Sequence, residues 1–219
     1  MTGFWKDAPE YLPILLQGVK LTVIVALGSL ALSTVLGIMW AMMRVSGIWI
    51  LETTAKVVIN TIRGIPILIQ LFYIYFVLPE FGIRLTAMQA SIIGLGIAYS
   101  AYQAENFRAG IEAIDHGQTE AAQSIGMSWG MMMRRVILPQ AIKIMIPPYG
   151  NVMIMMLKDS SQASTITVAE LALQGQIIAS STFKNTTVFT LVALLYLCMS
   201  VPLIILVGWL ERRLGTQRR

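Results

Sequence analysis

A single arginine lies inside a long apolar run of the sequence. Arg63 is followed by Gly64 and Pro66, which weaken a helix at this point. An ionisable side chain within a membrane span is costly and usually faces a cavity or another charge. Because a guanidinium group matches a carboxylate in bidentate geometry, Arg63 is a candidate contact for a carboxylate ligand. The structural alternative is that Arg63 pairs with Glu105 or Asp159.

Hydrogen-bonding side chains gather on one face of a second apolar run. Tyr99, Ser100 and Gln103 are spaced by three and four residues, so a helix places them on the same face. At 1.5 Å per residue, Ser100 and Gln103 lie roughly 18 and 22 Å below the outer edge of a ~30 Å membrane core. Glu105 points about 200° away from Gln103. It therefore either contacts a ligand or pairs with a cation such as Arg108.

A third polar group, Lys158, Asp159 and Ser160, follows another apolar run. The plain interpretation is a solvated loop in which the adjacent lysine and aspartate neutralise each other. Two consecutive prolines upstream interrupt the preceding helix and favour folding of this end inward. Residues 168–178 are predicted to form a short outer helix, placed as an external gate or as a docking surface.

The composition sets the class of protein in which these side chains lie. The chain has 219 residues, 56% hydrophobic and 12% charged, with a mean hydropathy of +0.71. Soluble domains have roughly 25% charged residues, so we expect an all-α membrane protein. Five runs are long enough to span a membrane, at approximately residues 15–43, 57–78, 88–108, 136–158 and 188–210. With one histidine, His116, and one cysteine, Cys198, we expect no metal site and no catalytic constellation.

Basic residues are distributed unevenly between the two sides that five spans define. Ten lysines and arginines fall on the side of the C-terminus and five on the side of the N-terminus, with Arg63 inside a span. Because positive loops favour the cytosol, we expect an outer N-terminus and a cytosolic C-terminus. The net charge of +5 thus follows from topology and does not indicate nucleic-acid binding.

Residues 112–135 form a water-facing interruption between the third and fourth runs. Thr119 is a suitable cap for a short helix, with Glu120 in the first turn, where the helix dipole favours an acid. Gly126 is expected to end or bend this helix. One interpretation is an interfacial helix among the lipid headgroups, with a downstream basic pair on the phosphates.

The spacing in this loop resembles the EAA loop of the membrane subunits of bacterial ABC importers. Glu120, Ala121 and Ala122 are followed by Gly126 and, after nine intervening residues, by "VILP", which ends at Pro139. The family pattern has isoleucine at the first position of "VILP". The resemblance implies that the short helix is a cytosolic coupling helix, which docks on a separate ATP-binding subunit.

Other stretches are similar to the polar amino acid branch of these importers, which includes histidine, glutamine and arginine permeases. They are "IRGIPILIQLF", "AYSAYQAENFRAGI" and "LKDSS". The resemblance implies a type I importer transmembrane domain with five transmembrane helices, and it brings Asp159 and Ser160 near a cargo pocket. The candidate cargo contacts are therefore Arg63, Tyr99, Ser100, Gln103, Glu105, Asp159 and Ser160.

The resemblance also implies a place in the bacterial cytoplasmic membrane, partners and a cargo. The sequence has no GxxxxGK[ST] motif, so ATP and Mg are expected on a dimer of partner ATPase subunits and no cofactor on this chain. A second copy or a sister permease, a solute-binding protein and membrane lipid complete the set. The expected cargo is a polar amino acid, and similarity to ectoine and hydroxyectoine permeases gives the alternative. An ion-coupled secondary transporter is less favoured, because such proteins normally contain internal repeats.

Overall fold

The computed structural model describes residues 2–214, which form helices joined by short connections. In this range the α-helices are α1 (Thr2–Arg44), α2 (Trp49–Gly64), α3 (Ile67–Phe72), α4 (Ala87–Glu112), α5 (His116–Ser124), α6 (Trp129–Met132), α7 (Leu138–Asp159), α8 (Leu171–Thr182) and α9 (Asn185–Arg213). Short 3₁₀ or π-type turns cover Tyr73–Val77, Leu78–Phe81, Met133–Ile137 and Ser160–Ile166. These residues contain no β-strand, which confirms the all-helical prediction.

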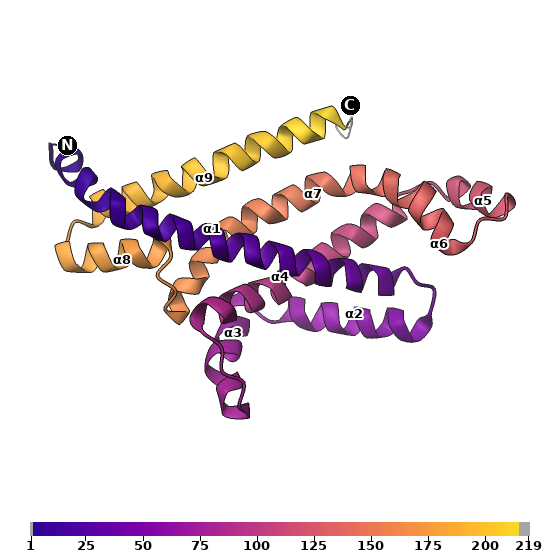
Figure 1. Cartoon of the computed structure of the whole chain (residues 1–219), viewed down its shortest axis with the longest axis horizontal. Coiled ribbons are helices and arrows are strands. Elements are labelled where there is room, and N and C mark those ends of the chain that lie inside the picture. The colour runs from indigo at the N-terminus through magenta and orange to yellow at the C-terminus, as the bar shows by residue number, and fades with distance from the viewer. Residues whose placement is uncertain (1, 215–219) are drawn as a thin grey trace.

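Four long helices, α1, α4, α7 and α9, run along the long axis of the molecule, and each contacts at least two of the others (Figure 1). With 43 residues, α1 is roughly 65 Å long at 1.5 Å per residue. Helix α8 packs on α1 and α9 at the end that carries the N-terminus, whereas α5 and α6 lie at the opposite end. The molecule therefore presents different short helices at its two ends.

Glycines allow α1 and α4 to approach closely. A Cβ atom on Gly37 would lie 2.7 Å from the Cβ of Gln103, and one on Gly96 would lie 2.7 Å from Cδ2 of Leu32. Because both distances are far below van der Waals contact, a larger residue would force the helices apart. Close approach at small residues is typical of helix pairs inside membranes, where dispersion contacts drive association.

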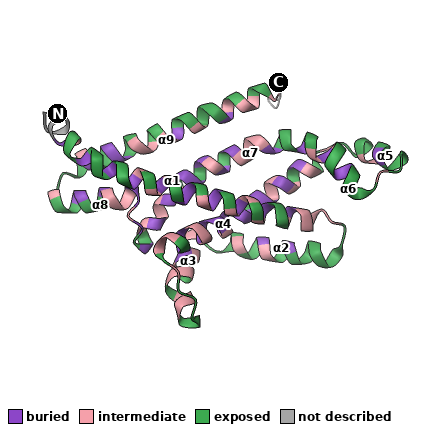
Figure 2. Cartoon of the chain, viewed as in Figure 1, coloured by how far each residue is buried: buried purple, intermediate pink, exposed green. Residues whose placement is uncertain are grey.

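Many large apolar residues are exposed on the outside of the bundle. Figure 2 shows the exposed residues in green along the long helices. Leu27 and Val35 of α1 are 58% and 67% exposed, and Ile205 of α9 is 62% exposed. Apolar surface of this extent marks a contact with lipid or with another chain. Residues 7–44 of α1 and the whole of α9 are each long and apolar enough to cross a membrane.

The second expected span, residues 57–78, is bent instead of straight. Segment Ile67–Phe81 continues from α2 at an angle of 98°. Ile65 is extended (φ −107°, ψ 128°), because the ring of Pro66 disfavours a helical conformation in the residue before it. If the bent pair is one span, residues 2–214 contain three segments with the length and hydropathy of a span. The count of five spans therefore remains a prediction.

One side chain fixes this bend. The amide nitrogen of Gln70 donates to the carbonyl oxygen of Ile62 at 2.9 Å and to that of Ile65 at 2.8 Å. The end of a helix leaves carbonyl groups short of backbone donors. The carbonyl of Ile62 accepts only a long bond of 3.4 Å from the N–H of Ile65, and the glutamine from the next helix supplies a second donor. The direction in which α3 leaves α2 is therefore set by hydrogen bonds as well as by proline.

The short helix expected over residues 168–178 is α8, displaced by several residues. It begins at Leu171 because the carboxylate of Glu170 accepts from the N–H of Leu173 at 2.9 Å and caps the helix there. The helix ends at Thr182, and the next residue, Phe183, has a left-handed conformation (φ 58°).

Candidate functional site

Arg63 lies in the last turn of α2, at the bend. Its guanidinium carbon is 5.6 Å from the ring centroid of Tyr102, a residue of α4 that is 38% exposed. Arg63 is itself exposed. The described residues show no ion pair between Arg63 and either Glu105 or Asp159. A cation–π contact at an exposed site contributes only about 0.5–1 kcal/mol, so the fold holds this guanidinium weakly.

Tyr102 continues into a second contact between helices. The ring centroid of Tyr99, one turn earlier on α4, lies 5.9 Å from that of Tyr102. The hydroxyl of Tyr99 donates to Oδ2 of Asp159, at the end of α7, over 2.5 Å. Arg63, Tyr102, Tyr99 and Asp159 therefore connect α2, α4 and α7, and we call them the tyrosine line. It carries opposite charges at its two ends and aromatic rings between them.

Three other predicted contacts are buried inside the chain. Ser100 and Ser160 donate to the carbonyl oxygens three residues before them, each at 2.7 Å. Gln103 is fully buried against Gly37 of α1, and its Oε1 accepts from Asn106 at 3.4 Å. Its amide nitrogen is buried without a hydrogen-bond partner. In this conformation these side chains do not lie on an open surface, and their contact with cargo remains a prediction.

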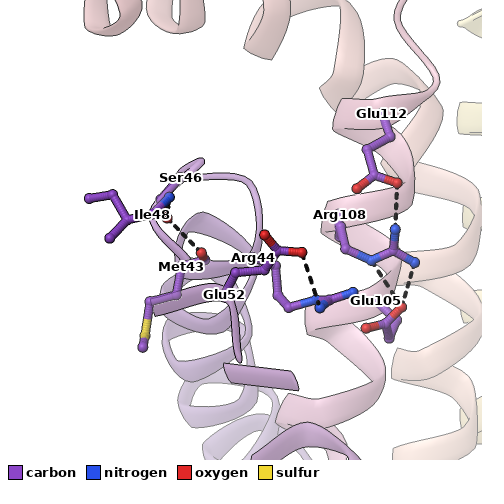
Figure 3. Close-up of polar contacts among 8 residues, drawn as sticks. All are labelled: Met43, Arg44, Ser46, Ile48, Glu52, Glu105, Arg108 and Glu112. Atoms are coloured by element: carbon purple, nitrogen blue, oxygen red, sulfur yellow. Dashed lines mark hydrogen bonds and ion pairs between the residues drawn. The ribbon is translucent and has the colours of Figure 1, made fainter. Parts of the chain in front are cut away.

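Glu105 forms an ion pair with Arg108 on the same helix (Figure 3). Its Oε2 accepts from Nη2 of Arg108 at 2.7 Å and from Nε at 3.1 Å, and Arg108 also binds Glu112. At the corner between α1 and α2, Arg44 lies 3.9 Å from Glu52. These two groups of paired charges, one on α4 and one at the corner between α1 and α2, lie near the end of the bundle that carries α5.

The water-facing loop contains the expected helix, but α5 begins earlier than predicted. Its first residue is His116, and Oδ1 of Asp115 accepts from the N–H of Gly117 at 2.7 Å. The prediction that Thr119 caps this helix was wrong, because Asp115 supplies a carboxylate at the true start. Thr119 lies within the first turns instead.

Gly126 ends α5, as expected. It has φ 75°, a left-handed conformation that glycine adopts without strain. Its N–H donates to the carbonyl three residues back at 2.9 Å, and that of Met127 donates to Ala122 at 3.1 Å. These two bonds make a Schellman cap. Ala122 is buried, whereas Glu120 and Ala121 are exposed and form the outward face of the helix.

An open pocket of about 600 Å³ lies where this loop meets the bundle. Its walls include Ile111, Glu112, His116 and Trp129. Beyond the loop, Pro139 is exposed in the first turn of α7, where its missing N–H costs no helical bond. Within residues 2–214, no three His, Cys, Asp or Glu side chains are grouped as a metal site.

The exposed apolar faces of this helical bundle are those of a membrane protein. Residues 33–216 match the family described as "binding-protein-dependent transport system inner membrane component", and the chain belongs to this family. Its members are permease components of ABC transporters, in which a separate subunit hydrolyses ATP.

Curated relatives match over nearly their whole length. The probable glutamine ABC transporter permease protein GlnM of Bacillus subtilis is 40% identical over 199 residues, which cover 91% of this chain and 92% of GlnM. The glutamine transport system permease protein GlnP of Escherichia coli is 36% identical over 212 residues, 96% of this chain and 97% of GlnP.

Solved structures share the fold. A crystal structure of an amino acid ABC transporter with histidines has a chain of 39% identity that superposes with a TM-score of 0.88, over 94% of this chain and 97% of that one. The inward-facing MetNI methionine ABC transporter, at 22% identity and a TM-score of 0.77, supports the fold alone. The helical fold is that of type I ABC importer permeases.

Sequence reasoning missed Tyr102. A signal was present, because Tyr102 follows Tyr99 by three residues and so lies on a neighbouring part of the same helix face. Its contact with Arg63, however, depends on how α2 packs on α4. Spacing within one helix does not give that arrangement.

Proposed function

We propose that this permease subunit imports a polar amino acid, and that the tyrosine line is where the cargo meets the chain. The observation that carries the proposal is the pair of opposite charges, Arg63 and Asp159, at the ends of two adjacent tyrosines. An amino acid has a carboxylate and an ammonium group, which complement these ends. The relatives are named as transporters of glutamine or of amino acids, which supports the same class of cargo.

Each residue of the tyrosine line has a distinct part in this proposal. Arg63 binds the carboxylate of the cargo in bidentate geometry. Its guanidinium is available for this because its contact within the chain is a weak cation–π contact with Tyr102. Asp159 binds the ammonium group through Oδ1, because Tyr99 already occupies Oδ2. Tyr102 lies between the charges and offers its face to the aliphatic part of the cargo. Because the residues stand on three helices, movement of these helices changes the site.

Helix α5 is the coupling helix in this proposal. Its exposed face, with Glu120 and Ala121, docks on an ATP-binding subunit that carries ATP and Mg. Asp115 and Gly126 cap its two ends within the chain. The helix therefore keeps its conformation and moves as a rigid body with the ATP-binding subunit. ATP binding by two such subunits moves the coupling helices together and reorients the bundle.

The proposed membrane placement has five spans, an outer N-terminus and a cytosolic C-terminus. It is supported by the position of α5 near the end to which α9 points, and of α8 beside the N-terminus (Figure 1). A solute-binding protein delivers cargo at the α8 end. A second copy of this chain, or a sister permease, completes the pathway.

Reconstitution tests the proposal. The chain is placed in vesicles with its ATP-binding subunit and binding protein, and uptake of glutamine, histidine, arginine and ectoine is measured with and without ATP. We expect ATP-dependent uptake of an amino acid. Uptake of ectoine alone would establish the compatible-solute alternative, and uptake driven by an ion gradient without the ATPase would contradict the proposal.

A further inference from the structure

Glu170 is a fully buried acid shared by three helices. Its Oε1 caps α8 through the N–H of Leu173. Its Oε2 accepts from Oγ1 of Thr22 in α1 at 3.2 Å and from the hydroxyl of Tyr196 in α9 at 2.8 Å. One carboxylate therefore joins the start of α8 to both of the helices on which α8 packs.

Close packing reinforces these hydrogen bonds. Oγ1 of Thr22 also accepts from the N–H of Leu171 at 3.1 Å. A Cβ atom on Gly18 of α1 would lie 2.8 Å from Cα of Leu171, and one on Gly175 of α8 would lie 2.6 Å from Cγ2 of Val192 in α9. Helix α8 thus has close contact with α1 on one side and with α9 on the other.

An ion pair joins α1 to the segment before α9 at the other end of α8. Nζ of Lys184, just before α9, lies 2.8 Å from Oδ1 of Asp7 in α1.

Burial raises the pKa of the Glu170 carboxyl, and hydrogen bonds including those from Tyr196 and Thr22 oppose that rise. A buried carboxylate that lost these donors would keep its desolvation cost without compensation.

We propose that Glu170 is a positioning residue that fixes α8 to α1 and α9. The three helices then move as one body during transport, and α8 does not act as a hinged outer gate. This inference rests on the proposed function, because it concerns the transport cycle. It selects against one of the two roles predicted for the short helix near residues 168–178.

Distance measurements between spin labels test this directly. In a Cys198→Ser background, labels are placed at the exposed positions Glu10 of α1 and Ser180 of α8. The assembled transporter, with its ATP-binding subunit and binding protein, is measured without nucleotide and in the ATP-trapped state. With Glu170 in place, we expect one narrow distance distribution that is the same in both states.

Variants separate the hydrogen bonds from the helix cap. Tyr196→Phe removes one donor and leaves the cap of α8 intact, whereas Thr22→Val removes a donor to Glu170 and also the acceptor of the Leu171 N–H. Losing one hydrogen bond to a buried carboxylate should raise the displaced population of α8 about tenfold or more. Glu170→Ala should raise it further, and Gln176→Ala, at an exposed position of α8, is the matched control.

Two results would overturn the inference. A change in the Glu10–Ser180 distance on ATP binding in the protein with Glu170 would show that α8 is a moving gate. Unchanged distributions in Tyr196→Phe, Thr22→Val and Glu170→Ala would show that this carboxylate does not hold the helix. The milder variants give an answer even if Glu170→Ala fails to assemble. ATP-dependent uptake by the unlabelled protein tests the proposed function separately, because it requires no label on α8.

Discussion

Replacing Arg63 by alanine distinguishes two roles for this residue, binding of cargo and stabilisation of the fold. In the fold, the guanidinium has only the ring of Tyr102 at 5.6 Å as its neighbour in the tyrosine line. Losing that contact should cost about 0.5–1 kcal/mol of stability. Loss of one partner of a buried ion pair would instead cost about 3–5 kcal/mol. We therefore expect Arg63→Ala to unfold at nearly the same temperature as the unmodified protein.

Uptake should respond much more strongly. A hydrogen bond to a charged group contributes about 1.5–3 kcal/mol, and each 1.4 kcal/mol corresponds to a factor of ten. If Arg63 binds the carboxylate of the cargo as it passes, uptake should fall by roughly 10- to 150-fold. Arg63→Lys keeps the charge without the bidentate geometry, so it should lose less.

The assay is ATP-dependent uptake in vesicles, beside thermal unfolding of the same preparation. Lys56→Ala removes another exposed cation from the same helix and is the matched control. Normal uptake by Arg63→Ala would refute the cargo assignment. A large loss of stability in that variant would show that Arg63 has a structural role that its contacts do not reveal.

Three further substitutions test other parts of the structure. Glu120→Lys reverses a charge on the outward face of α5, so stimulation of ATP hydrolysis by loaded binding protein should be lost while the protein stays in the membrane; normal stimulation would refute the coupling assignment. Gly126→Val forces a β-branched residue to φ 75°, at a cost of about 1–2 kcal/mol, and should weaken the same stimulation. Gly96→Leu should lower the unfolding temperature, because α4 lies against α1 at this point. Gly130→Ala, where a Cβ meets nothing within 4 Å, is its control, and equal effects would contradict the packing argument.

Patterns within one segment were the part of the fold that could be predicted from sequence. Apolar runs indicated a helical membrane protein, and the position of Gly126 indicated the end of α5. The break at Pro66 was visible as a weak point, but its 98° angle depends on the amide of Gln70, which comes from the next helix. The start of α5 was misplaced because Asp115 and Thr119 are both good caps, and sequence alone does not decide between them.

Contacts between helices set the candidate site, and these were harder to anticipate. Tyr99, Ser100 and Gln103 share a face, as their spacing predicts, but that face does not lie on an open surface, since Gln103 packs on α1. Tyr102, one turn further, is the residue that remains open beside Arg63. Which part of a helix is covered depends on the glycines of its neighbour, so the periodicity of α4 could not reveal it.

A structure of the assembled transporter, trapped with cargo by electron cryo-microscopy, tests the central claim most directly. We expect the cargo between Arg63 and Asp159, with its carboxylate toward the guanidinium and its side against the ring of Tyr102. Cargo that lies more than one helical turn from both Arg63 and Tyr102 would contradict the claim and show that the tyrosine line serves only to pack the helices.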